Sequence, residues 1–106
     1  MNLKLLNALS LNMINEPHGS IAFREITRDE SRKLLAGGFE SAVGHEDTAA
    51  VIGDQLGVGV PINRTTVALQ KGDRAIVAQY RGPRLPAGAT RLPADATIAW
   101  YMVEIA

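Results

Sequence analysis

One short stretch turns an apolar strand into the start of a helix, and the rest of the chain is interpreted around it: Ser41-Ala42-Val43-Gly44-His45-Glu46-Asp47-Thr48. The apolar run ends at a glycine, and a histidine, two carboxylates and a threonine follow, which is typical of a helix N-terminus. The helix should cover residues 46–56, where apolar residues recur at helical spacing, and Gly57 should end it. This pattern places His45 at the mouth of the helix, beside backbone N–H groups that can bind an anion.

The flanking segments predict strands at residues 3–11, 20–26, 39–43, 65–70, 74–80 and 97–105. The first should leave the sheet near Asn7, and the alternating Ile21 and Phe23 should bury one side of the second. Ala75–Ala78 is apolar on both faces, so the fifth strand should be central. Because only Lys71–Asp73 separates the fourth strand from the fifth, these two strands should form a hairpin.

A second, shorter helix should begin after Thr27, because Thr27 and Glu30 match a capping box in which each side chain satisfies an exposed backbone N–H. It should run through Ala36, and the pair Gly37-Gly38 should end it. Strands mixed with two helices on 106 residues predict an α/β fold. We expect one domain over residues 1–106, with a mixed sheet of about five strands and two short helices packed on it.

The composition excludes several classes of protein. Eleven basic residues balance eleven acidic ones, so the overall charge disfavours a protein that coats long nucleic acid. The absence of cysteine excludes disulfides, thiolate catalysis and cysteine-ligated metal sites. Residues 1–6 are largely apolar, but polar residues interrupt the run far short of a membrane span and no cationic segment precedes it. A cytoplasmic location without a membrane partner is therefore expected.

The candidate chemistry rests on one histidine. His18 lies in a Pro/Gly turn and is expected at the surface, and even His45 could be structural, as a lone histidine at a helix start usually is. No serine–histidine–carboxylate order, paired-carboxylate motif or glycine-rich phosphate loop is visible, and no metal or cofactor is expected. One imidazole, several arginines and a helix start suit a phosphodiester. RNA carries its own nucleophile, so its cleavage needs in-line positioning, charge stabilisation and an acid for the leaving 5′-oxygen.

Two groups of polar residues have two interpretations each. Asn7, Ser10 and Asn12 either bond their own backbone in a turn or line a pocket with small hydrogen-bonding groups. The arginines of the second half of the chain either bind phosphate or form ordinary surface salt bridges.

Four blocks of the sequence resemble, in order and spacing, the small viral proteins that include the type III anti-CRISPR ring nucleases, which also have bacterial and phage relatives. The blocks are Leu6–Met13, Ser41–Thr48, Asn63-Arg64, and Arg84-Leu85 with Gly88. The resemblance covers nearly the whole chain except its variable loops.

The resemblance implies a homodimer that binds cyclic tetra-adenylate in a pocket on its two-fold axis. Cleavage to linear di-adenylates would need no metal and would antagonise type III CRISPR signalling, in the host cytoplasm if a phage or virus encodes the protein. His45 matches the catalytic histidine that protonates the leaving oxygen, and Arg84 matches the arginine that holds phosphate. The ligand-binding set expected from the matched blocks is Asn7, Ser10, Asn12, Gly44, Arg64 and Arg84.

One departure from the family pattern leaves the activity open. Where the family has a glutamate three residues after the arginine, this chain has Ala87, and Glu46 or Glu104 would have to stand in for that carboxylate. The protein is therefore expected to be a ring nuclease, with a non-hydrolytic cyclic-nucleotide sponge as the alternative. A second alternative is a viral regulatory protein that binds nucleic acid or a partner protein.

Overall fold

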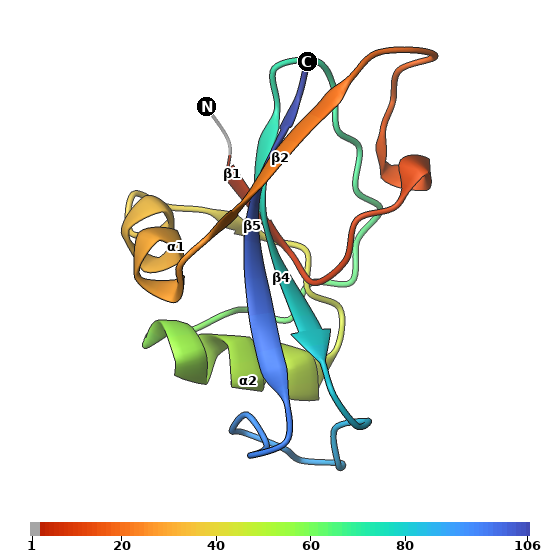
Figure 1. The fold of residues 1–106 in the computed structure, drawn as a ribbon. Coiled ribbons are helices and arrows are strands. Elements are labelled where there is room, and N and C mark those ends of the chain that lie inside the picture. Colours follow the sequence, from red (N-terminus) through yellow and green to blue (C-terminus); the bar gives the residue numbers. More distant parts are fainter. Residues whose placement is uncertain (1–2) are drawn as a thin grey trace.

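The computed structural model describes residues 3–106, so Met1 and Asn2 of the apolar opening segment lie outside the described residues. The elements along the chain are β1 (Leu3–Leu6), the 3-10 turn η1 (Leu11–Met13), β2 (Ile21–Ile26), α1 (Arg28–Leu35), β3 (Glu40–Ser41), α2 (Glu46–Leu56), β4 (Arg74–Arg81) and β5 (Thr97–Ile105). The five strands form one sheet in the order β2-β5-β4-β1-β3 (Figure 1). β1 pairs parallel with β3 and β4, whereas β5 pairs antiparallel with β2 and β4. This confirms the predicted α/β fold with a mixed five-stranded sheet.

The two faces of the sheet carry separate apolar clusters. Ile76 and Ala78 of β4 belong to the cluster that includes buried residues of α1 and α2, so the helices cover that face (Figure 1). Ala75 and Val77 point the other way and belong to a cluster with residues of the loops and of η1's end. All four of these β4 residues are buried, which confirms that β4 is a central strand.

Both helices begin where the sequence signals predict; α2 also ends at the predicted residue, whereas α1 ends at Leu35, one residue earlier than predicted. The Thr27 hydroxyl accepts a hydrogen bond from the Glu30 N–H at 3.0 Å, but the Glu30 carboxylate accepts from Arg24 at 3.0 Å, so only half of the expected capping box forms. α2 spans the predicted residues, and Gly57 takes the left-handed conformation at its C-cap, with φ +72°. Neither helix of the described chain is long and apolar enough to cross a membrane.

The predicted hairpin of residues 65–70 with 74–80 is wrong. β4 pairs with β1 on one side and β5 on the other, so both of its edges are already occupied. Residues 65–70 form no strand, and Leu69 makes only an isolated bridge to Ile14. The apolar side chains of this run, Val67 and Leu69, are buried in the cluster on the face away from the helices. Their hydrophobicity therefore reflects burial beneath a loop and not strand pairing.

The prediction that one side of β2 is buried is also wrong, because this side is largely exposed in the single chain. β2 is an edge strand, and only Ile26 of its six residues is buried. Ile21 is 37% exposed and Phe23 is 71% exposed, although both were expected to face a core. The alternation predicted the strand correctly, but no element within residues 3–106 covers its apolar side.

Candidate functional site

The first turn of α2 is open toward solvent. His45 is the N-cap residue, with φ −120° and ψ 133°, and its side chain makes no capping hydrogen bond. The His45 carbonyl accepts the first helical bond from Ala49 N–H at 2.9 Å, while the side chain itself is exposed. The N–H groups of residues 46–48 come before this first helical bond, and the His45 side chain does not cap them. They therefore remain for water or a bound anion.

The segment 61–64 is fastened to the turn that precedes α2. The Ser41 hydroxyl donates to the Pro61 carbonyl at 2.6 Å, and the Asn63 amide donates to the Ser41 carbonyl at 2.7 Å. A Cβ added to Gly44 would lie 3.4 Å from Cα and Cβ of Arg64, so the two segments pack closely. This packing explains why two matched blocks that are separate in sequence meet in space, and it places Arg64 beside Gly44.

A hollow of about 860 Å³ lies between the start of α2, the end of β4 and the loop that follows β4. We call it the His45 hollow; its lining residues are His45, Asp47, Thr48, Tyr80, Gly82, Arg84, Leu85 and Ala87. His45 and Arg84 therefore share one cavity although they are far apart in the sequence. The loop that carries Arg84 lies at the lower end of Figure 1, next to α2.

The charged side chains that line the His45 hollow are one guanidinium, Arg84, and one carboxylate, Asp47, and Arg64 lies nearby beside Gly44. Across residues 3–106, the ion pairs join Lys4 with Glu40, Arg24 with Glu30 and Arg32 with Asp29. Arg64 and Arg84 have no carboxylate partner among the described residues, so the salt-bridge interpretation does not apply to them. No three histidine, aspartate or glutamate residues of the described chain gather to form a metal-binding group.

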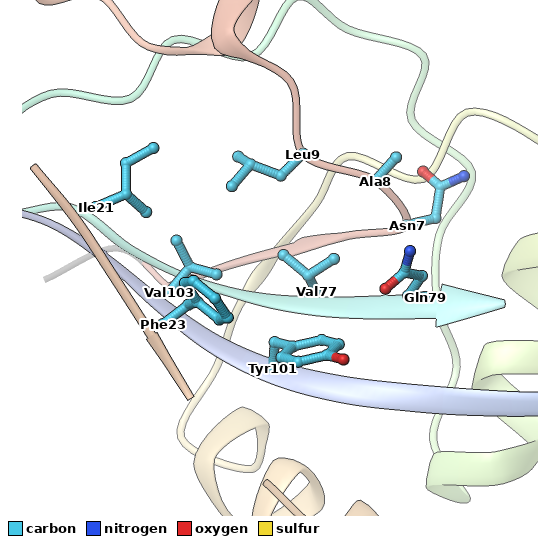
Figure 2. A pocket seen from close by; sticks show the side chains of 9 residues that line it. All are labelled: Asn7, Ala8, Leu9, Ile21, Phe23, Val77, Gln79, Tyr101 and Val103. Atoms are coloured by element: carbon cyan, nitrogen blue, oxygen red, sulfur yellow. The ribbon is translucent and has the colours of Figure 1, made fainter. Parts of the chain in front are cut away.

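A second cavity, of about 370 Å³, lies on the sheet face away from the helices (Figure 2). We call it the sheet groove; β2, β4, β5 and the segment after β1 supply its lining residues, which are Asn7, Ala8, Leu9, Ile21, Phe23, Val77, Gln79, Tyr101 and Val103. The rings of Phe23 and Tyr101 meet edge to face, with centroids 6.2 Å apart. None of the nine lining residues carries a charge.

The structure divides the predicted site residues into two sets. Gly44, His45, Arg64 and Arg84 lie around the start of α2. Asn7 lines the sheet groove, whereas Ser10 and Asn12 lie exposed at η1 and line neither cavity. Ser10 is the N-cap of η1, yet its side chain makes no capping bond. One chain therefore does not bring all of the predicted ligand-binding residues together.

Comparison with known proteins identifies the family. The family model described as STIV B116-like matches residues 3–97. The chain belongs to the STIV B116-like family. The chain is 35% identical over 77 residues to an uncharacterized protein, ORF117, of Acidianus two-tailed virus, an alignment covering 70% of this chain and 65% of that protein. It is also 35% identical over 75 residues to uncharacterized protein 26 of Sulfolobus islandicus filamentous virus, covering 70% and 64%.

These alignments span just under two thirds of each STIV B116-like relative's own length. The fold is also that of B116 of Sulfolobus turreted icosahedral virus, with a TM-score of 0.80 over 98% of this chain and 99% of that chain, at 24% identity. The comparisons thus confirm that the chain belongs to a family of small proteins from archaeal viruses.

Most residues that line the His45 hollow were not predicted as site residues, and the polar ones among them include Asp47 and Tyr80. Asp47 carries only the signal of an acidic residue in the first turn of a helix, which is common and uninformative. Neither proposed stand-in for the missing glutamate lines this cavity. In the register of β4 and β5, Glu104 lies opposite Arg74, whereas Ile98 lies opposite Tyr80 of the hollow. Glu104 and Ile98 are therefore about 20 Å apart along β5.

Proposed function

We propose that this protein binds cyclic tetra-adenylate in a pocket shared by two protomers and cleaves it without a metal to linear di-adenylates. In a host cytoplasm this reaction would antagonise type III CRISPR signalling. The observation that carries the proposal is the meeting of His45 and Arg84 in one cavity beside an uncapped helix N-terminus. An imidazole, a guanidinium and free backbone N–H groups are the parts that a phosphodiester requires.

The proposed mechanism uses the ligand's own nucleophile. A ribose 2′-hydroxyl attacks the adjacent phosphorus, its proton passes to solvent, and the bond from phosphorus to the 5′-oxygen breaks. His45 donates a proton to that leaving oxygen, while Arg84 and the helix N-terminus stabilise the charge that develops on the phosphate. With two-fold symmetry, one copy of each residue would act on opposite sides of the ring and give two linear products.

The sheet groove supports the homodimer in this proposal. A two-fold interface brings the same patch of each protomer together, so a patch without charged residues meets no like-charge repulsion. The lining residues of the groove are uncharged, and Phe23 and Ile21 leave large apolar surfaces exposed. Exposed apolar patches of this kind usually mark protein contacts. We therefore assign the groove to contact with a second copy of the chain.

The alternative is a sponge that binds the cyclic ligand and leaves it intact. Ala87 lines the His45 hollow at the position where the family resemblance expects a glutamate, so the carboxylate of that pattern is missing. If cleavage depends on that carboxylate, binding through Arg84 and the helix start would remain and turnover would fall.

Incubation with radiolabelled cyclic tetra-adenylate, followed by denaturation and chromatography, distinguishes the candidates. Linear di-adenylates that accumulate over several turnovers in the presence of EDTA support the nuclease. Stoichiometric recovery of the intact ring supports the sponge. If the protein binds no cyclic oligoadenylate at micromolar concentration, both fail, and a regulatory protein that binds nucleic acid or a protein partner becomes the better candidate.

A further inference from the structure

The loop between β4 and β5 carries Arg84 but, within residues 3–106, makes few hydrogen bonds to the rest of the molecule, one of which runs from the Tyr80 hydroxyl of β4 to the Pro83 carbonyl. Its described backbone bonds are local, from Ala89 N–H to the Pro86 carbonyl at 3.1 Å and from Ala96 N–H to the Pro93 carbonyl at 3.1 Å. Arg84 itself is exposed and lies in a stretch rich in proline and glycine. A loop of this kind needs contacts with the scaffold to hold one side chain in a fixed place.

One contact joins this loop to the helix that begins at His45. The Asp47 carboxylate accepts a hydrogen bond from the Gly88 N–H at 3.1 Å. Gly88 has φ +79° and is the third residue of a turn closed by the bond between Ala89 and Pro86. A left-handed conformation at that position favours glycine, and the turn leaves its N–H free for Asp47.

We propose that Asp47 is a positioning residue that holds the Arg84 loop against the start of α2. Asp47 follows His45 by two residues in the chain, and Gly88 follows Arg84 by four. The bond between Asp47 and Gly88 therefore joins the segment that carries the imidazole to the loop that carries the guanidinium across the His45 hollow. This inference rests on the proposed function, since Arg84 needs a fixed place only if it binds the ligand's phosphate.

The contact is accessible to solvent, so its loss should loosen the loop without unfolding the protein. Hydrogen–deuterium exchange of the unliganded protein measures this directly. In Asp47→Ala, we expect the amides of residues 84–89 to exchange about fivefold faster, as the loss of one modest hydrogen bond implies. Asp47→Asn keeps an acceptor oxygen and should restore most of the protection. Glu46→Ala removes a neighbouring first-turn carboxylate without a loop contact, so its loop exchange should match that of the original protein.

Kinetics separate positioning from other roles. If the loop must be closed for ligand to bind, Asp47→Ala should raise KM by about the same fivefold factor and change kcat by less than about twofold, since saturating ligand restores the closed state. Asp47→Asn should restore KM. A lower kcat with unchanged KM would indicate either a smaller fraction of folded enzyme or a direct chemical role for Asp47. Either result would overturn the inference.

The exchange experiment keeps this inference separate from the proposed function. If the original protein neither binds nor cleaves cyclic tetra-adenylate, the proposed function fails, while faster loop exchange in Asp47→Ala would still establish the tether. If cleavage occurs but loop exchange and KM are the same in Asp47→Ala, the positioning role fails and the nuclease stands.

Discussion

Replacement of Phe23 by alanine tests whether the sheet groove binds a second copy of the chain. Phe23 is 71% exposed on the edge strand β2, so most of its ring remains to be buried by a partner. Complete burial of a phenylalanine contributes about 1.5–3 kcal/mol, which leaves about 1–2 kcal/mol for each copy. Because a two-fold interface contains both copies, we expect the dimer to lose about 2–4 kcal/mol. The dissociation constant should then rise about 30- to 700-fold.

The same substitution should have little effect on the fold of the protomer. Its main loss there is the edge-to-face contact with Tyr101, which contributes about 0.5–1.5 kcal/mol. Sedimentation equilibrium over a range of concentrations measures the dissociation constant, and chemical unfolding checks the protomer. Ile62→Ala is the matched control, because Ile62 is 55% exposed and does not line the groove. An unchanged dissociation constant in Phe23→Ala, or an original protein that is monomeric at high micromolar concentration, would refute the assignment.

Two further substitutions test the site and the fold. His45→Ala should lower the rate of ring cleavage about 10²- to 10⁴-fold, the usual contribution of a general acid, and leave ligand binding intact by calorimetry; loss of the fold in this variant would instead indicate a structural histidine. Gly53→Ala should destabilise the protein by about 1–3 kcal/mol in urea unfolding, although alanine normally favours a helix by about 1 kcal/mol, because its Cβ would lie 2.8 Å from the Val58 carbonyl oxygen. Increased stability in that variant would mean that the loop after α2 relaxes freely.

Local signals in the sequence predicted the elements that depend on local physics. α2 was predicted at its observed bounds because a glycine turn precedes it and Gly57 ends it, and β5 was predicted over its observed length because turn residues bound an apolar run. The hairpin prediction failed because the β propensity of residues 65–70 carries no information about which strands already occupy the edges of β4. Strand pairing is decided by the whole sheet, whereas helix ends are decided by a few neighbouring residues.

In the candidate site too, features that depend on neighbouring residues were predicted, whereas contacts with distant segments were not. His45 was predicted from its own neighbours, since a histidine before a helix start is visible in the sequence. The loop contact of Asp47 was missed because its partner, the Gly88 N–H, lies far along the chain and a backbone donor has no sequence signature. The exposure of Phe23 was missed because alternation predicts an apolar side without identifying what covers it. Each failure concerns a contact with a distant segment or, by our proposal, with another chain.

The end of β4 links the proposed interface to the proposed chemistry. Consecutive residues of a strand point to opposite faces, and here Gln79 lines the sheet groove while Tyr80 lines the His45 hollow. A partner that covers the groove therefore contacts the same strand end that forms one wall of the hollow. Asn7 lines the groove and not the hollow, so it can join His45 at one ligand only if that ligand also reaches the interface. In the proposed dimer, a ring bound on the two-fold axis would satisfy this condition, whereas a small ligand held within one protomer would not.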